Sequence, residues 1–278
     1  MNYLKRIFEF YIFSNTHVAL AGYCITKITL LKFGYSENLT PLFVALSIVV
    51  SYNFIRLYEI KYDHLNWLKE WFVKHKLRLF FLSVIAILGL VYSVFFTNFE
   101  KRSIYILIPF GFMTFFYVIP LFKIGNIEVS FRNFPAIKIL SIAISWAGLS
   151  VFFPLFEVGY SFTNFVYLEF FQRILFVMAI TIPFVIRDVT TDSKALKTLP
   201  QLIGIKKAKY LGIGLLSIFI GIDFFKLAIS QSELIVTIGI AIISALFLLF
   251  SSENNSRYYT GFWVESVPII WFVLIYLF

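Results

Sequence analysis

Charged residues are scarce in this sequence: Asp, Glu, Lys and Arg make up 14% of its 278 residues, whereas 60% are apolar. A soluble domain carries roughly 25% charged residues, so the chain has too few polar groups to cover a water-facing surface. Its single cysteine, Cys24, excludes an internal disulfide, and the sequence has no Cys/His cluster with zinc-ligand spacing. These absences argue against a disulfide scaffold, a zinc domain and soluble classes in general.

Long apolar runs are what the sequence has instead, and they recur from end to end. A run of about 20 residues can cross roughly 30 Å of hydrocarbon as a helix. Breaks at charged residues and at Pro, Gly and Asn clusters separate nine candidate spans. The spans cover residues 16–34, 40–56, 79–98, 103–122, 134–156, 163–186, 208–229, 233–250 and 259–277. We therefore predict an all-α membrane protein whose residues 1–278 form one polytopic domain.

The basic residues indicate an orientation. Most of the 24 Lys and Arg residues precede the first span or lie between spans 2 and 3, 4 and 5, 6 and 7, and 8 and 9. Cytoplasmic segments carry an excess of Lys and Arg, so we expect a cytoplasmic N-terminus and an external C-terminus in a bacterial cytoplasmic membrane. The same distribution explains the net charge of +9 without a nucleic-acid partner.

Two segments outside the spans are predicted to lie at the membrane surface. Residues 1–15 contain Lys5 and Arg6, but Glu9 interrupts their apolar run and no small-residue cleavage site follows. A short interfacial helix is therefore expected there in place of a cleaved signal. Residues 57–77 have apolar side chains at helical spacing and lysines on other faces. They predict an amphipathic helix that either covers the cytoplasmic mouth of the bundle or only anchors the loop.

A polar loop at residues 187–207 follows the sixth predicted span. It contains Asp188 and Asp192, which would project from one face if the helix continued, because they are four residues apart. Two carboxylates in this arrangement can coordinate Mg²⁺, a hard cation that often bridges to substrate phosphates. Neighbouring basic side chains could bind phosphate oxygens directly; they are Arg187, Lys194 and Lys197. The alternative is a pair of solvated acids at a helix end, neutralised by the lysines.

The wider pattern resembles the second aspartate motif of the UbiA superfamily of intramembrane prenyltransferases. After Asp188 and Asp192, the matching residues are Thr198, Leu199, Pro200, Gly204 and Ala208. In that family the motif lies between spans 6 and 7 of nine and faces the cytoplasm, where the charge pattern places it here. The family's basic segment between spans 4 and 5 is similar to a second set: Tyr117, Pro120, Lys123, Arg132, Pro135 and Lys138. Asn53 matches the asparagine that opens the family's first motif.

The resemblance implies a nine-helix bundle with a central cavity open to the cytoplasmic side. It implies an isoprenyl diphosphate donor, with Mg²⁺ held by Asp188 and Asp192 and the first half-site oriented by Asn53. The diphosphate would be contacted by Lys123, Arg132, Arg187, Lys194 and Lys197. The acceptor or the cavity would involve Tyr117, Lys138 and Glu265. Glu265, several residues into the last span, can equally be a buried, protonated or hydrogen-bonded acid.

The first family motif is degenerate in this chain. Its two aspartates would stand four and eight residues after Asn53, where this sequence has Leu57 and Lys61. The acids nearby, Glu59 and Asp63, lie about 200° further round a helix. Three arrangements stay open: the Lys61 ammonium replaces a metal ion, a local bulge brings one acid round, or the site binds a prenyl lipid without chemistry.

The predicted function is transfer of an isoprenyl group from its diphosphate to an acceptor, which can be aromatic. One rival shares the fold but binds a prenyl lipid or a membrane partner without transfer, and the missing acids favour it. A transporter is the other rival, but no internal repeat of the expected kind is evident. Inside span 6, Glu169 and Arg173 are four residues apart, and we predict a structural ion pair in preference to a functional charge.

Overall fold

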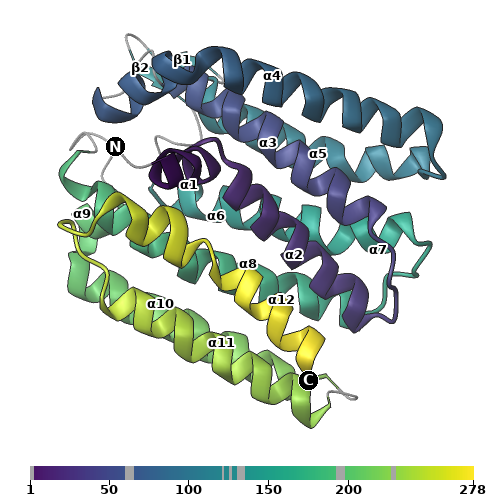
Figure 1. Ribbon diagram of the computed structural model, residues 1–278. Coiled ribbons are helices and arrows are strands. Elements are labelled where there is room, and N and C mark those ends of the chain that lie inside the picture. Colours follow the sequence, from purple (N-terminus) through teal and green to yellow (C-terminus); the bar gives the residue numbers. More distant parts are fainter. Residues whose placement is uncertain are drawn as a thin grey trace.

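Helices account for nearly all of the computed structural model, which describes residues 3–59, 66–120, 122–124, 127–129, 135–191, 198–226 and 230–278. The longer helices run along a common direction and form one bundle (Figure 1). The first half of the chain contributes α1 (Tyr3–Phe13), α2 (Thr16–Lys32), α3 (Leu39–Glu59), α4 (Asn66–Phe96) and α5 (Ile104–Val118). The second half contributes α6 (Pro135–Ala147), α7 (Phe153–Glu157), α8 (Asn164–Arg187), α9 (Leu199–Ile203), α10 (Ile205–Asp223), α11 (Gln231–Leu249) and α12 (Val267–Leu277). Shorter 3-10 or π segments are η1 (Lys101–Ser103), η3 (Gly148–Phe152), η4 (Asp188–Thr190) and η6 (Tyr259–Val264).

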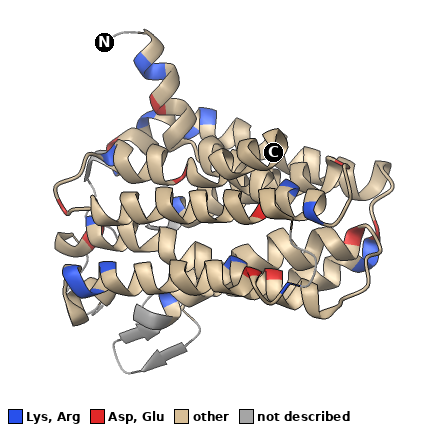
Figure 2. Ribbon diagram, turned by 90° about the horizontal axis from the view of Figure 1, so that it is seen from below, with Lys and Arg blue, Asp and Glu red and all other residues tan. Residues whose placement is uncertain are grey.

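Every predicted span coincides with a helix in the described part of the chain. Within the residues that the structure describes, six helical segments are long and apolar enough to cross a membrane. They are Leu39–Leu57, Leu68–Phe96, Ile137–Glu157, Asn164–Thr190, Gln231–Leu249 and Tyr259–Leu277. The helices α2 and α5 have 17 and 15 residues, and α10 has three lysines among its first five residues. The total number of crossings therefore stays a prediction, whereas the helical class is confirmed. Lys and Arg lie mainly toward the two ends of the long helices (Figure 2).

The amphipathic segment predicted at residues 57–77 is not a separate helix. Its described C-terminal part forms the first turns of α4, which continues without a break to Phe96. These turns pack against α1, since the Trp71 ring lies 5.7 Å from that of Phe13. One turn earlier on the same face of α1, the carboxylate of Glu9 accepts hydrogen bonds from Arg257 (2.9 Å) and Tyr258 (2.6 Å). The predicted N-terminal helix thus exists and is fastened to the end of the bundle.

The helices close into a ring because the last one packs on the first long one. Along this ring α2 contacts α3, α5 packs between α3 and α6, α6 contacts α8, and α12 contacts α2. Outside the ring, α4 packs on α3, while α10 and α11 pack on α8 and α12. One apolar core joins α2, α6, α8, α10, α11 and α12 around the fully buried Trp271. A second core joins α2 with α3 and α4. The helices of the ring surround the cavity described below.

A small hairpin interrupts the otherwise helical structure between α5 and α6. Strands β1 (Phe122–Ile124) and β2 (Ile127–Val129) pair antiparallel, with Phe122 opposite Val129 and Ile124 opposite Ile127. The hairpin lies near the end of the bundle where α3 ends and α4 begins (Figure 1). It occupies the basic segment that the family resemblance singled out, and no strand was predicted there.

Gly148, the first residue of η3, permits α5 to approach closely. A Cβ at this position would lie 2.1 Å from Cζ of the Phe110 ring, and overpacking of this kind costs about 1–3 kcal/mol. We expect Gly148→Ala to lower the free energy of unfolding by that amount in detergent. Gly239→Ala in α11 is the matched control, because a Cβ there meets no atom within 4 Å and should stabilise the helix by about 0.5–1 kcal/mol. Equal behaviour of the two variants would contradict the close approach.

Candidate functional site

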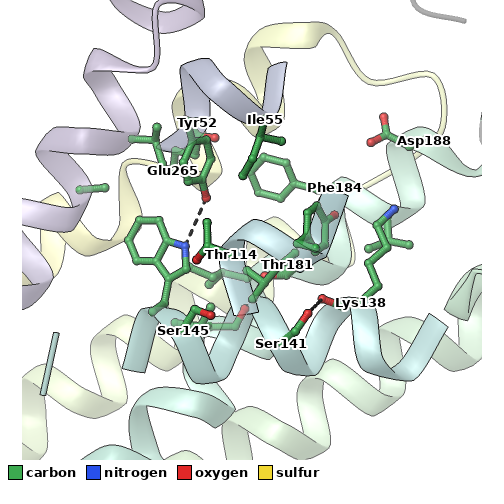
Figure 3. A pocket seen from close by; sticks show the side chains of 18 of the residues that line it. Tyr52, Ile55, Thr114, Lys138, Ser141, Ser145, Thr181, Phe184, Asp188 and Glu265 are labelled. Atoms are coloured by element: carbon green, nitrogen blue, oxygen red, sulfur yellow. Dashed lines mark hydrogen bonds between the residues drawn. The ribbon is translucent and has the colours of Figure 1, made fainter. Parts of the chain in front are cut away.

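The ring of helices encloses a cavity of about 230 Å³. Its walls come from α2, α3, α5, α6, α8 and the segment that joins η6 to α12. Most of the lining is apolar and includes Ile25, Ile55, Ile142, Val177 and Phe184. Hydroxyl groups from α5, α6 and α8 also face it, as Figure 3 shows for Thr114, Ser141, Ser145 and Thr181. The cavity can therefore hold a mainly hydrocarbon ligand that carries some polar groups.

Three cationic side chains line one end of this cavity, which we call the mouth. Arg56 comes from the last turns of α3, Lys138 from the first turn of α6, and Arg187 is the last residue of α8. The two arginines stand at helix C-termini, where the helix dipole favours positive charge. Lys138 and Asp188 lie on the same side of the cavity in Figure 3. With Asp188 as the acidic residue beside them, the mouth has an excess of positive charge among the described residues and suits an anion.

Asp188 and Arg187 form a two-pronged ion pair at the mouth. Arg187 donates from Nε to Oδ1 of Asp188 (2.7 Å) and from Nη2 to Oδ2 (2.9 Å). Its remaining nitrogen, Nη1, donates to the Thr260 hydroxyl in η6 at 2.7 Å. Two-pronged arginine–carboxylate pairs are strong and fix both partners in orientation. The pair therefore positions the Arg187 guanidinium between α8 and η6.

The described residues do not form an Mg²⁺ site by themselves. A bound Mg²⁺ needs carboxylate oxygens that are open to it, but both oxygens of Asp188 accept hydrogen bonds from Arg187. No group of three or more His, Cys, Asp or Glu side chains comes together in the parts of the chain that the structure describes. The second predicted ligand, Asp192, lies outside those parts.

The end of α8 bears on the predicted metal site, whose second ligand, Asp192, lies outside the described residues. The same-face argument for Asp188 and Asp192 required α8 to continue past residue 188, but α8 ends at Arg187 and Asp188 begins the 3-10 turn η4. Asp188 is followed by the β-branched residues Val189, Thr190 and Thr191. Asp and β-branched residues are weak helix formers, so the helix stops at this polar string. Asp188 nevertheless lines the cavity.

Asn53 and Leu57, at positions of the first family motif, are not among the residues that line the cavity. Asn53 is buried and does not line the cavity; its side chain accepts a hydrogen bond from Asn15 (2.8 Å) and donates one to Ser83 (3.1 Å). Asn15 adopts a left-handed conformation at the turn between α1 and α2, with φ 66°. Leu57, at the position of the first missing aspartate, is 56% exposed. The residue of α3 that reaches the mouth is Arg56, which the motif comparison did not consider.

The remaining predicted site residues fall into two groups. Tyr117, Lys138, Arg187, Asp188 and Glu265 all line the cavity. The others are Lys61, Arg132, Asp192, Lys194 and Lys197, which lie outside the described residues, and Lys123, whose backbone belongs to β1. The structure also does not test whether a bulge repositions Glu59 or Asp63. Asp63 lies outside the described residues, and only the backbone of Glu59 is described.

Glu265 reaches the cavity from the end of the π segment η6. Its carboxylate makes no hydrogen bond or ion pair within the described part of the chain, whereas its backbone N–H donates to the Thr260 carbonyl at 3.2 Å. In Figure 3 it lies beside Tyr52, away from Asp188. Local π segments often occur at functional sites because they re-aim a side chain. Glu265 is thus an acceptor of hydrogen bonds placed inside a largely apolar space.

The predicted pair of Glu169 and Arg173 is confirmed, at 2.8 Å, and it belongs to a larger buried cluster. Glu169 also contacts Lys226 (2.8 Å) and Lys32 (3.3 Å). Lys226 in turn contacts Asp223 at 3.0 Å. These five groups, which we call the buried charge cluster, join α2, α8 and the end of α10. Glu169 is near the start of α8, and the mouth residue Arg187 is at its end, so the cluster and the mouth lie at opposite ends of the bundle.

Comparison with known proteins gives a match in structure. The sequence matches no protein-family model, and no curated protein is similar to it in sequence. A solved structure described as a UbiA homologue from Archaeoglobus fulgidus bound to GPP and Mg²⁺ superimposes with a TM-score of 0.67. The likeness covers 96% of this chain and 98% of that one, at 13% sequence identity. At this identity the likeness establishes the fold, and the resemblance seen in the sequence is confirmed at that level.

Proposed function

We propose that this chain, which has the fold of the UbiA superfamily, binds an isoprenyl diphosphate in the membrane and transfers its isoprenyl group to an acceptor. The observation that carries the proposal is a cavity with three cations at its mouth and a mainly apolar interior. An isoprenyl diphosphate has the complementary form, with an anionic head and a hydrocarbon chain. That the similar structure was described with GPP and Mg²⁺ bound supports the same class of ligand.

In this proposal the diphosphate head is bound directly by Arg56, Lys138 and Arg187. Arginine matches phosphate oxygens with two parallel hydrogen bonds, and lysine acts as a point charge. The ion pair with Asp188 holds Arg187 toward the cavity while its Nη1 bonds Thr260. Arg56 would supply positive charge where the first aspartate motif is degenerate. The basic residues Lys61, Lys123, Arg132, Lys194 and Lys197 are proposed to add further contacts.

The role of Mg²⁺ is the second part of the proposal. A divalent ion at the mouth would be held by Asp188 with Asp192 and would neutralise diphosphate charge. Because Arg187 occupies both oxygens of Asp188, direct binding of the diphosphate by cations is the alternative. Asn53 is proposed to support the first half-site through its bonds between α2, α3 and α4, in place of contacting the ligand.

The transfer itself requires three changes at the reacting atoms. The bond between the first isoprenyl carbon and the diphosphate oxygen breaks, and its electron pair stays with the diphosphate. A new bond forms between that carbon and the acceptor, which then loses a proton to the released diphosphate. Glu265, with Tyr117 and the hydroxyl groups of the cavity, is proposed to orient the acceptor, because its carboxylate can accept a hydrogen bond from an acceptor O–H or N–H group. Aromatic acceptors such as phenols or anilines carry an O–H or N–H group of this kind.

The proposed placement is a nine-span bundle in a bacterial cytoplasmic membrane with the mouth toward the cytoplasm. The mouth residues Arg56, Lys138 and Arg187 all belong to the set of basic segments predicted to face inward. Figure 1 places the two chain ends toward opposite ends of the bundle, as an odd number of crossings requires.

A binding protein without transfer is the alternative function. It is favoured by Leu57 and Lys61 at the positions of acids and by the engagement of Asp188 with Arg187. Purified protein should be incubated with labelled isoprenyl diphosphates, with Mg²⁺ or with a chelator, and then with aromatic acceptors that carry O–H or N–H groups. Release of inorganic diphosphate with labelled product supports transfer, whereas bound and unconverted donor supports the alternative. Absence of donor binding in both conditions would refute the proposal.

A further inference from the structure

A second cavity of about 50 Å³ lies next to the main one. The two cavities share Ile25, Tyr52, Thr114, Ser145 and Trp146 as lining residues. Beyond these shared residues the second cavity is lined by Val44, Ser47, Ile48, Ser51, Leu149 and Ser150. It therefore begins where the main cavity ends, behind a wall of side chains from α2, α3, α5 and α6.

The centre of this wall is a hydrogen-bonded aromatic pair. The Trp146 indole Nε1–H donates to the Tyr52 hydroxyl at 3.2 Å, and the two rings are perpendicular with centroids 6.4 Å apart. Figure 3 shows the bond at the end of the cavity away from Asp188 and Lys138. The hydrogen bond and the edge-to-face contact hold the two rings against each other, so the pair separates the two cavities.

The partition lies on the path that leads inward from the mouth. Along α6, Trp146 follows Lys138 by eight residues, a rise of about 12 Å. Along α3, which runs the other way, Tyr52 lies one turn inward of Arg56, and Ile48 and Val44 lie one and two turns further. Both helices thus give the same order, with the mouth first, then the Tyr52–Trp146 pair, and then the second cavity.

We propose that the Tyr52–Trp146 pair is the floor of the donor site and limits the isoprenyl chain to about two units, or ten carbons. An extended isoprenoid unit spans four carbon–carbon bonds of about 1.5 Å each and so advances by roughly 5 Å. About 12 Å between the levels of Lys138 and Trp146 therefore takes two units, and a third meets the rings. The second cavity is the blocked continuation of the same channel. This inference rests on the proposed binding of an isoprenyl diphosphate.

The test is competition binding with isoprenyl diphosphates of 10, 15 and 20 carbons against labelled ten-carbon donor. We expect the wild-type protein to bind the 15- and 20-carbon compounds more weakly than the ten-carbon one, because their additional units meet the rings. In Trp146→Ala the two cavities merge, so the affinity for the 15-carbon compound relative to the ten-carbon one should rise about tenfold, or about 1.4 kcal/mol. Trp146→Leu, which leaves more volume in the core, should show a smaller rise and serves if the alanine variant does not fold.

The control is Trp263→Ala, the same change at a side chain that is 54% exposed on the outside of the bundle. It should keep the wild-type preference, and comparison with it cancels the partition of longer chains into detergent micelles. Equal wild-type affinity for all three chain lengths, or an unchanged preference in both Trp146 variants, would overturn the floor but leave the proposed function intact. If no isoprenyl diphosphate binds to the wild-type protein, the proposed function is refuted, and the proposed limit on chain length is refuted with it.

Discussion

Glu169→Gln is expected to lower the free energy of unfolding by about 3–5 kcal/mol, which is the usual cost of removing one partner from a buried ion pair. Glu169 is 2% exposed and contacts Arg173, Lys226 and Lys32. Its replacement leaves three cations facing one remaining acid, Asp223, in an apolar surrounding. Unfolding in detergent micelles, followed by circular dichroism against denaturant, measures the loss.

A second substitution in the buried charge cluster shows whether unbalanced charge or lost hydrogen bonds destabilise Glu169→Gln. Glu253→Gln, in an exposed turn, is the matched control and should stay within about 0.5 kcal/mol of the wild type. The double variant Glu169→Gln, Lys226→Met restores the original net charge of the cluster and should recover part of the loss. If the double variant is less stable than Glu169→Gln, the penalty comes from broken hydrogen bonds and not from unbalanced charge.

Arg187→Met is expected to weaken isoprenyl diphosphate binding about 100-fold, or about 2.7 kcal/mol. The change removes a charged donor from the mouth and also leaves the Asp188 carboxylate without the partner that holds both its oxygens. The negative charge of Asp188, no longer balanced by Arg187, would then repel the diphosphate. Binding of labelled ten-carbon diphosphate to the purified variant, with and without Mg²⁺, measures the effect.

A double variant, Arg187→Met with Asp188→Asn, shows whether Asp188 acts through Arg187 or through a metal ion. Arg102→Met, an exposed cation at the other end of the bundle, controls for general loss of charge and should bind as the wild type does. In Arg187→Met, Asp188→Asn the repelling carboxylate is absent, so binding should improve over the single variant. If it worsens and the dependence on Mg²⁺ disappears, Asp188 contributes as a metal ligand. Unchanged binding in Arg187→Met would remove Arg187 from the donor site.

The helices were predictable because long apolar runs are local features of a sequence. The run predicted at 163–186 is α8, Asn164–Arg187, and the run predicted at 233–250 is α11, Gln231–Leu249. The start of α4 was misjudged because residues 74–80 contain neither Gly nor Pro, so the amphipathic and apolar parts join without a signal. A hairpin of six strand residues is too short for its alternation to stand out.

The candidate site was predictable only where a motif pointed to it. Asp188, Arg187, Lys138, Tyr117 and Glu265 were found from spacing, resemblance or an unusual charge within a span, and all line the cavity. Arg56 was missed because the motif comparison looked for acids four and eight residues after Asn53. The first of these positions is Leu57, but it is the residue before it, Arg56, that lines the cavity.

Contacts that depend on distant parts of the chain could not be read from spacing. The sequence indicated that Glu169 meets Arg173, because four residues make one helical turn. It gave no sign that Lys32, 137 residues away, and Lys226, 57 residues away, converge on the same carboxylate. The Tyr52–Trp146 pair, 94 residues apart, is of the same kind.

The length of α4 bears on how the proposed donor would reach the cavity. Its 31 residues extend for about 46 Å, which exceeds the roughly 30 Å of the bilayer interior. Its first turns carry the exposed residues Lys69, Lys74, Lys76 and Arg78 at the end of the bundle where α3 delivers Arg56. Under the proposed function, these basic turns would attract anionic lipids in the adjoining headgroup layer, and a phosphorylated donor in that leaflet would reach the mouth at a raised local concentration.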